Sequence, residues 1–203
     1  MPKLERIREV INKILSVEEL REHVCFFGGS IPYIITNQES NRDHSDIDVL
    51  VDEEYMDIVR DLVKLHNLYI PAKDSLNLGV DGDYGLKVFI DGVYVEFEPM
   101  SIKDNNFIRK SFSPSKQLVG EEITPFEDIN DLITRVEIDG KEVMVETLEF
   151  IKVGKEKYQR DKDIEDVKFI DRQGIDEDKY LRAKTSFSNT EVKMTHYSQE
   201  KSL

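Results

Sequence analysis

The sequence predicts an α+β fold, with a mixed β-sheet flanked by helices and a C-terminal helical segment. In the first third of the chain, short apolar runs alternate with segments whose apolar residues recur at helical spacing. Later apolar runs flank two Asp-Gly pairs, Asp91-Gly92 and Asp139-Gly140, which are typical of two-residue hairpin turns. Early alternation and later hairpins together favour a mixed sheet.

The N-terminal elements follow from spacing and turn residues. Apolar residues at intervals of three and four predict an amphipathic helix over residues 3–15. Ser16 and Glu19 match a capping box, so a second short helix is expected there. Residues 23–27 form an apolar run that ends in Gly28-Gly29-Ser30, which is typical of a strand, a tight turn and the start of a helix.

The next elements are predicted from the same signals. They are a core strand over 47–51, a helix over 53–66, a strand over 68–72, hairpins over 86–99 and 135–145, and a helix from Thr147 to about residue 172. Gly154 weakens the last helix, because glycine has a low helix propensity.

The chain is expected to hold one domain and an extension. Residues 1–172 form the domain, with its core at about 20–100, and residues 173–203 form a C-terminal extension. From about Thr185 the extension is rich in Ser, Thr and Lys and shows little periodicity. A mobile end is therefore expected.

The charge limits the function classes. The 203 residues include 42 acidic and 28 basic side chains, which gives a net charge of −14. Phosphate backbones and anionic membranes would be repelled, which disfavours a general nucleic-acid or anionic-membrane binder. No apolar run approaches the roughly 20 residues of a membrane-spanning helix. A protein that collects divalent cations or handles a cationic substrate fits this charge.

Cys25 bears on the compartment. It is the only cysteine, so an intramolecular disulfide is excluded, and it lies in an apolar run where a buried structural thiol is expected. The N-terminus is charged and lacks the apolar segment of a secretory signal. A cytoplasmic location is therefore expected.

The sharpest chemical feature is Gly28-Gly29-Ser30 followed by Asp46 and Asp48. Aspartates two residues apart on a strand point to the same face, and their charges repel unless a cation lies between them. Paired carboxylates suit Mg²⁺, which takes one or two carboxylates together with substrate phosphates. A Gly-Gly turn lets the backbone approach a phosphate, and Ser30 can add a hydroxyl donor. Each feature alone is usually only a turn or a solvated strand end.

Further acids and histidines complete the candidate set. Glu96 and Glu98 share one face of a hairpin strand, where they are either the third acid of a metal site or the polar outer face of a sheet. His44 is either an exposed loop residue or a supporting group near the metal ligands. The other histidines show no zinc-ligand spacing.

These motifs resemble the nucleotidyltransferase superfamily of the DNA polymerase β type, and most of all its small lincosamide and aminoglycoside nucleotidyltransferases and their relatives. His44-Ser45-Asp46 is similar to the family's His-x-Asp-x-Asp, and the segment 95–99 resembles apolar-Asp-x-(Glu or His)-Pro, with Glu96 where Asp is more usual. The segment from Lys152 to Val167 resembles the Lys…Arg-x-Lys-Asp…Asp-Ile helix. The resemblance covers about residues 20–170.

The resemblance implies transfer of a nucleoside monophosphate from an NTP such as ATP to a hydroxyl, with release of pyrophosphate. Asp46, Asp48 and Glu96 would be the catalytic metal ligands, holding two Mg²⁺ ions once NTP is bound. Gly28, Gly29 and Ser30 would hold the β- and γ-phosphates. Lys152 would meet a phosphate while Asp163, eleven residues later on the same helical face, orients it. Glu98 would contact the acceptor.

Three function classes stay open. The first is a nucleotidyltransferase for a small, cationic, antibiotic-like acceptor. The second is a toxin-like or regulatory nucleotidyltransferase that modifies protein or tRNA; residues 179–203 hold five Lys or Arg against two Glu. The third is a non-catalytic nucleotide-binding module, against which the complete set of acids argues. The sequence indicates neither the acceptor nor the oligomeric state.

Overall fold

The computed structural model describes residues 4–40 and 44–197. The strands are β1 Val24–Phe27, β2 Asp46–Asp52, β3 Leu86–Ile90, β4 Val93–Lys103, β5 Asn106–Ser113, β6 Leu118–Pro125, β7 Ile133–Ile138, β8 Lys141–Glu146 and β9 Glu191–His196. The helices are α1 Leu4–Ile14, α2 Glu18–Arg21, α3 Ile31–Ile35, α4 Met56–Leu65, α5 Leu148–Tyr158, α6 Asp161–Asp171 and α7 Glu177–Ser188. No helix of the described residues is long and apolar enough to cross a membrane.

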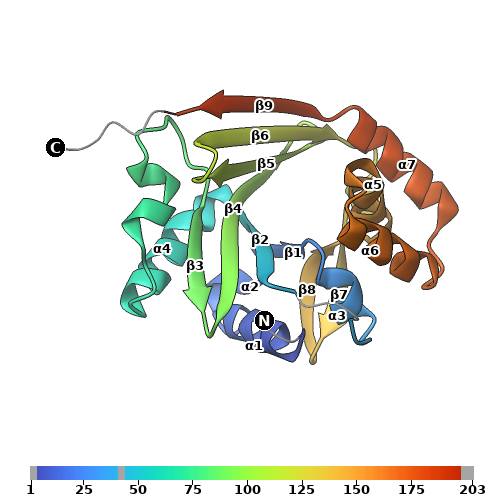
Figure 1. Cartoon of the computed structure of the whole chain (residues 1–203), viewed down its shortest axis with the longest axis horizontal. Coiled ribbons are helices and arrows are strands. Elements are labelled where there is room, and N and C mark those ends of the chain that lie inside the picture. The colour runs from blue at the N-terminus through green and yellow to red at the C-terminus, as the bar shows by residue number, and fades with distance from the viewer. Residues whose placement is uncertain (1–3, 41–43, 198–203) are drawn as a thin grey trace.

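One mixed sheet organises the described part of the chain (Figure 1). Its strand order is β7-β8-β1-β2-β4-β5-β6-β9, and β3 pairs with β4. β2 runs antiparallel to β1 and parallel to β4. Helices α5, α6 and α7 gather at one end of the sheet and α4 at the other. The predicted α+β fold, a mixed sheet flanked by helices with a C-terminal helical segment, is confirmed.

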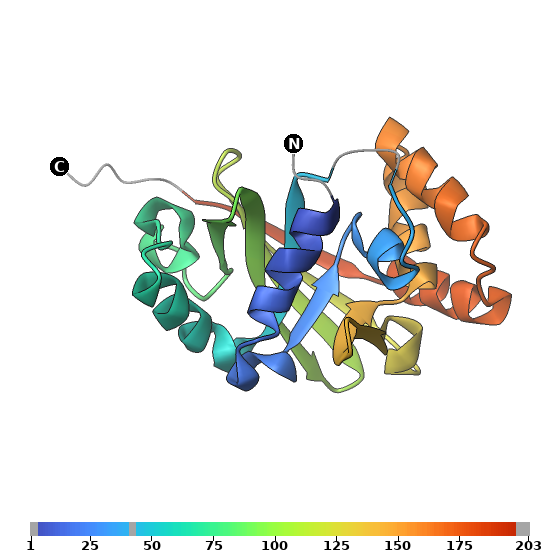
Figure 2. The same ribbon diagram turned by 90° about the horizontal axis from the view of Figure 1, so that it is seen from below.

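Alternation along β2 decides which face of the sheet is core and which is site. Ile47, Val49 and Val51 are fully buried against the main apolar cluster, which includes Ile7 and Ile11 of α1. Figure 2 shows α1 running across this face of the sheet. Burial of each such side chain contributes about 1.5–3 kcal/mol. Asp46 and Asp48 therefore point to the opposite face.

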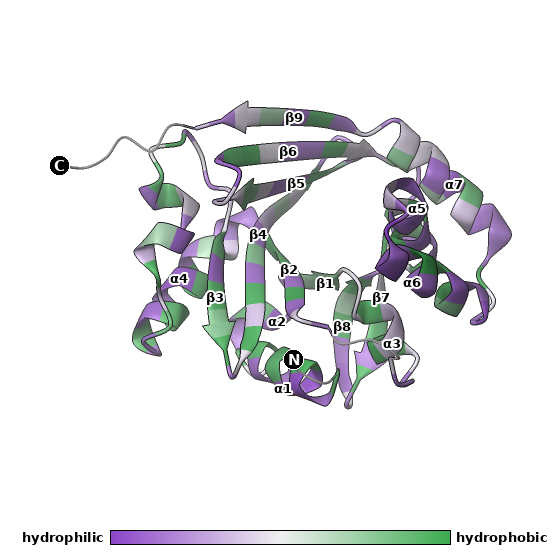
Figure 3. Ribbon diagram, viewed as in Figure 1, coloured by the Kyte–Doolittle hydropathy of each residue, from purple (hydrophilic) through white to green (hydrophobic). Residues whose placement is uncertain are grey.

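The opposite face is apolar only in part. A second cluster, which includes Leu50, Met100 and Phe107, packs against Phe150 of α5 and Ala183 of α7. The rest of this face carries charged residues, and the alternation of hydrophobic and hydrophilic residues along β4 is visible in Figure 3. The polar part of this face is where the candidate site lies.

Several predicted elements need correction. No strand forms at 68–72; Pro71–Lys73 is instead a short 3₁₀ turn, because proline lacks the N–H that a strand ladder requires. The segment that follows is pinned to α4 by a buried ion pair, in which Arg60 binds Asp74 with Nε–Oδ2 at 3.0 Å. Ser16 makes no capping box, since its hydroxyl donates to the carbonyl of Lys13 and α2 begins at Glu18.

The helix predicted from Thr147 to about residue 172 is two helices. The break does not occur at Gly154 but at Gln159, which is left-handed with φ of 50° between α5 and α6. A left-handed residue ends a helix because the next carbonyls no longer point along its axis. Thr147 does cap α5, accepting a hydrogen bond from the N–H of Phe150 at 3.1 Å.

Regular structure continues past about Thr185, where little periodicity predicted a mobile end. Thr185 lies within α7, and β9 pairs with β6 from Leu118↔His196 to Ile123↔Glu191. A backbone ladder stabilises this segment in place of apolar burial. Residues 198–203 lie outside the described residues. The domain boundary at residue 172 stays a prediction.

Candidate active site

The register of β2 and β4 brings the four candidate acids to one face of the sheet. Asp48 lies opposite Glu96 on the parallel neighbour, Asp46 opposite Tyr94, and Glu98 opposite Leu50. Because alternate residues share a face, both aspartates and both glutamates point away from α1. Four carboxylates on adjoining strands make this the most acidic part of the sheet.

Gly28 lies against one of the two aspartates. Phe27, the last residue of β1, pairs with Asp48, and the chain then turns at Gly28 with φ of +90°. A Cβ on Gly28 would lie 2.5 Å from Oδ2 of Asp48. Only glycine fits this position, since both the φ angle and the space exclude a side chain. Ser30 is 2% exposed and precedes a helix of five residues, so its hydroxyl lies beneath the turn.

A cavity of about 620 Å³ opens beside this turn. It is lined by Gly28 and Gly29, by both aspartates, and by residues of β5, β6, β8, β9 and the three C-terminal helices. Neither Glu96 nor Glu98 belongs to its lining among the described residues. The cavity therefore joins the two aspartates on the face of the sheet to the helices that follow β8.

The two glutamates have different surroundings. Glu96 forms an ion pair with Lys87 of β3, and the ammonium is nearly buried. Glu98 is 8% exposed, and burial raises its pKa to about 7, partly offset by the charge of Arg109. Burial, followed by the negative charges of Glu98, Asp46 and Glu96, also raises the pKa of Asp48 well above its usual range.

A partly buried ion cluster that sequence reasoning missed lines the same cavity. Arg109 of β5 forms an ion pair with Glu122 of β6, and its Nη1 lies 3.9 Å from Oε1 of Glu146 at the end of β8. Its guanidinium stands over the ring of Phe27 at 5.0 Å. Burial alone would lower the pKa of Arg109, but the surrounding carboxylates outweigh it and raise the pKa.

The cluster reaches the Gly28 turn. Oε2 of Glu146 accepts a hydrogen bond from the N–H of Gly28 at 3.5 Å, and burial raises the pKa of Glu146. No local sequence signal identifies these residues. Arg109 and Glu122 come from two strands that the sequence did not predict, and their alternating charges resemble an ordinary solvated surface.

A group of basic side chains lines the cavity where α5 meets α6. Its members are Lys155, Lys157, Arg160 and Lys162. Lys155 Nζ lies 3.1 Å from Oδ1 of Asp163 and 3.0 Å from Oδ2 of Asp166, both of which are buried. Arg160 Nε donates to Asp163 at 2.6 Å. Two buried aspartates thus hold Lys155 and Arg160 at the cavity wall.

The structure does not bring Lys152 into the cavity. Its Nζ lies 2.7 Å from Oδ1 of Asp171, and it stands over the ring of Tyr180. The break at Gln159 explains the difference, because Lys152 and Asp163 belong to separate helices and share no face. Asp163 orients Lys155, not Lys152. The predicted pairing of Lys152 with Asp163 is therefore wrong.

His44 is buried at 3% exposure and lines the cavity. Its Nε2 lies 2.8 Å from Oγ of Ser40, and its ring lies 5.2 Å from that of Tyr33. The exposed-loop interpretation is therefore wrong for this histidine. It lies two residues before Asp46 and contacts Ser40 and Tyr33.

The donor chemistry of the aspartate pair fits Mg²⁺. Asp46 and Asp48 offer only carboxylate oxygens, and their mutual repulsion is relieved by a cation. In the described part of the chain, no three or more Asp, Glu, His or Cys side chains are already grouped as a metal site. Two carboxylates together with substrate phosphates meet the usual coordination of Mg²⁺, so this pair of aspartates suffices as the protein ligands of a Mg²⁺ site.

The structure places a glycine turn after β1, two aspartates on its antiparallel neighbour β2 and a further acid on the parallel strand β4. Together these features define a class of protein fold. The described chain has the nucleotidyltransferase fold, and the predicted resemblance is confirmed at that level. The chain is similar to the antibiotic-resistance factor ANT(2'')-Ia, with a TM-score of 0.55 and 17% identity over 91% of this chain and 92% of that chain.

Two further solved structures show the same likeness. One is the lincomycin-bound lincosamide antibiotic adenylyltransferase LnuA, with a TM-score of 0.52 and 14% identity over 80% of this chain and 93% of that chain. The other is ANT(2'')-Ia in complex with adenylyl-2''-tobramycin, with a TM-score of 0.53 and 17% identity over 90% and 98%. No protein-family model and no curated protein matches the chain.

Proposed function

We propose that the chain is a metal-dependent nucleotidyltransferase that moves a nucleoside monophosphate from an NTP to a hydroxyl of a small acceptor. The contact of Gly28 with Asp48 carries the proposal, because it sets a backbone suited to phosphate directly beside a carboxylate suited to Mg²⁺. The likeness in fold to two antibiotic nucleotidyltransferases supports it.

Asp46 and Asp48 would hold the metal, with Glu96 completing the site on the acceptor side. When bound, two Mg²⁺ ions supply charge neutralisation and Lewis-acid polarisation for phosphoryl transfer. Lys87 holds the Glu96 carboxylate in the structure, so this glutamate has to exchange its ammonium partner for a metal. The protein's part is to present oxygens on one sheet face.

The triphosphate would lie between the Gly28-Gly29 turn and the basic side chains of the α5–α6 junction. Both groups line the same cavity. Lys155 is better placed for a phosphate than Lys152, because its ammonium lies at the cavity wall, fixed by Asp163 and Asp166. The predicted hydroxyl contact from Ser30 requires the buried side chain to reach the ligand.

The acceptor would enter from the side of the partly buried ion cluster of Arg109, Glu122 and Glu146. Glu98, with its pKa of about 7, can accept the proton of an acceptor hydroxyl near neutral pH or bind an acceptor amine. Glu122 and Glu146 line the cavity and suit a cationic acceptor, as does the net charge of −14. A cytoplasmic location remains part of the proposal, supported by the free and buried Cys25.

Two other functions remain as competing outcomes. A nucleotidyltransferase that modifies protein or tRNA would use the same acids. A non-catalytic nucleotide-binding module would keep the cavity and its basic wall without turning over the NTP.

One experiment separates these functions. The protein is incubated with Mg²⁺ and each α-³²P-labelled NTP, together with tobramycin, lincomycin, total tRNA or a protein extract. Label in a small-molecule product that disappears in Asp48→Asn supports the proposal. Label only in tRNA or protein supports the second function, and NTP binding without any labelled product supports the third. The strand-mate Asp52→Asn serves as the matched control, since Asp52 pairs with His23 away from the cavity.

A further inference from the structure

The last described strand forms one wall of the candidate site. β9 pairs antiparallel with β6 at the edge of the sheet, and Figure 1 shows it along the top of the view, following α7 and lying beside β6. All six residues of β9 are exposed. A strand that buries none of its side chains contributes little to the core, so its side chains are available for contact with a ligand.

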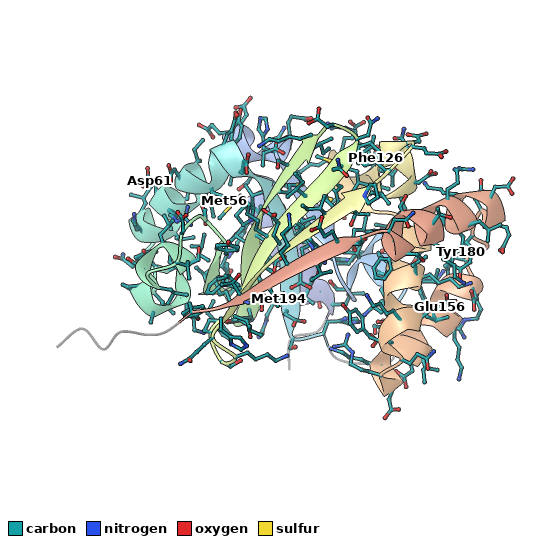
Figure 4. The ribbon with its side chains drawn as sticks, turned by 90° about the horizontal axis from the view of Figure 1, so that it is seen from above. Met56, Asp61, Phe126, Glu156, Tyr180 and Met194 are labelled. Carbon is teal, nitrogen blue, oxygen red and sulfur yellow. The ribbon has the colours of Figure 1, made fainter. Side chains whose placement is uncertain are left out.

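Two large apolar side chains of β9 face the cavity. Val192 and Met194 line it and are 49% and 56% exposed. Period-2 geometry sends Lys193 and Thr195 to the other side of the strand. Figure 4 shows Met194 on β9, with the labelled Tyr180 and Glu156 near the helices at the end of the strand. The apolar side of β9 is therefore turned toward the site and not toward the core.

The neighbouring strand makes room for this wall. Met194 lies opposite Gly120 of β6, and a Cβ on Gly120 would lie 2.6 Å from the Sδ of Met194. The methionine side chain therefore lies across the glycine. Thr124 and Thr190 share a hydrogen bond at 3.0 Å, which ties the start of the strand to β6.

A charged group lies directly beside the apolar wall. Val192 is opposite Glu122, which in turn is opposite Arg109. The paired residues Arg109, Glu122 and Val192 thus lead across three strands from the partly buried ion cluster to the apolar side of β9. A ligand in this part of the cavity meets a carboxylate and, one strand further, an aliphatic surface.

We propose that β9 is the acceptor-binding wall, and that Val192 and Met194 determine specificity by contacting the apolar part of an acceptor that also carries an amine. This inference rests on the proposed function in calling the ligand an acceptor. The apolar binding surface on β9 does not depend on that function. It names the substrate class as amphipathic amines, in which an alkyl group lies near a positive charge.

Binding is tested first, without turnover. The protein is labelled with ¹³C at the methionine methyl groups, and the Met194 signal is assigned by its loss in Met194→Ala. Lincomycin, an amine with alkyl substituents, and tobramycin, a polyamine without them, are titrated separately. We expect lincomycin to shift the Met194 signal and tobramycin to shift it less. Absence of any Met194 shift at millimolar lincomycin overturns the inference.

Variants then separate the wall from the rest of the site. Val192→Ala and Met194→Ala should each weaken lincomycin binding about tenfold, the usual effect of truncating one apolar contact. Lys193→Ala removes a side chain of similar length from the other side of β9 and should change binding less than about twofold. Equal effects of Met194→Ala and Lys193→Ala would also overturn the inference.

The outcomes distinguish this inference from the proposed function. If lincomycin shifts the Met194 signal but no nucleotidyl transfer is detected, β9 is still a binding surface and the transferase assignment is wrong. Transfer to lincomycin that is unaffected by both apolar variants leaves the transferase assignment intact and removes the wall.

Discussion

Gly28 and Asp48 are in direct contact: the backbone of the turn after β1 leaves no room for a side chain, because any Cβ would lie 2.5 Å from the aspartate's Oδ2. Two elements that are twenty residues apart in sequence are thereby locked together at the point where phosphate and metal would meet. The contact makes the turn sensitive to substitutions that a similar turn elsewhere would tolerate.

Replacing Gly28 with alanine should abolish transfer. The new methyl group displaces the Asp48 carboxylate and also strains a backbone with φ of +90°. Gly140→Ala is the matched control, since Gly140 has φ of +76° with nothing within 4 Å of its Cβ position. Both variants should lose about 1 kcal/mol of stability from backbone strain, and only Gly28→Ala should lose activity. Thermal unfolding and transfer rates measure the two effects; equal activity in both variants would contradict the role of the contact.

Asp48→Asn should reduce the transfer rate below about a tenth of the wild-type value, a rise of at least about 1.4 kcal/mol in the barrier. It should also raise the melting temperature of the metal-free protein, because it removes a carboxylate whose pKa is raised by burial and by the neighbouring acids. Mg²⁺ with NTP should stabilise the wild type and not the variant. A variant that keeps more than about a tenth of the wild-type rate would show that the assignment of Asp46 and Asp48 as metal ligands is wrong.

Glu98→Gln should stabilise the protein in a pH-dependent way. Burial raises the Glu98 pKa from 4.5 to about 7, so ionisation costs folding free energy that grows as pH rises from about 4.5 and is complete above about 7. The variant should therefore gain up to about 3 kcal/mol at pH 8 and nothing at pH 4. Urea unfolding at both pH values tests this, and a gain in stability that is independent of pH would show that burial does not raise the Glu98 pKa.

The same two glutamates should differ in kinetics. Glu96→Gln should lower the turnover rate with every acceptor and alter the metal dependence, whereas the effect of Glu98→Gln should vary between acceptors. Transfer rates with at least two acceptors, measured across a Mg²⁺ titration, decide between these patterns. If Glu98→Gln is inactive with every acceptor while Glu96→Gln stays active, the roles of metal ligand and acceptor contact must be exchanged between the two glutamates.

Lys155→Ala should weaken NTP binding, and Lys152→Ala should not. Lys155 lines the cavity, while Lys152 is engaged with Asp171 outside it. Lys155→Ala should also destabilise the fold by about 3 kcal/mol, because Asp163 and Asp166 lose a buried partner. The KM for NTP, measured below the melting temperature of each variant, distinguishes the two lysines. A larger rise in KM for Lys152→Ala than for Lys155→Ala would support the predicted phosphate contact of Lys152.

Local sequence patterns determined a large part of this protein. Apolar alternation through Ile47, Val49 and Val51 placed Asp46 and Asp48 on one face of a strand, and the Asp-Gly pairs placed both hairpins. These features depend on residues that are neighbours in the chain, so a period or a turn residue is enough to reveal them.

Only the tertiary structure decided the rest of the site. Arg109, Glu122 and Glu146 come from three strands and form one ion cluster. Lys155, and not Lys152, pairs with Asp163, because the helix that contains both lysines ends at Gln159. β5, β6 and β9 escaped prediction because many of their side chains are charged, polar or exposed, which obscures the apolar alternation that marks a half-buried strand. Contacts between distant segments leave no period in the sequence, so their partners are set by strand order and register alone.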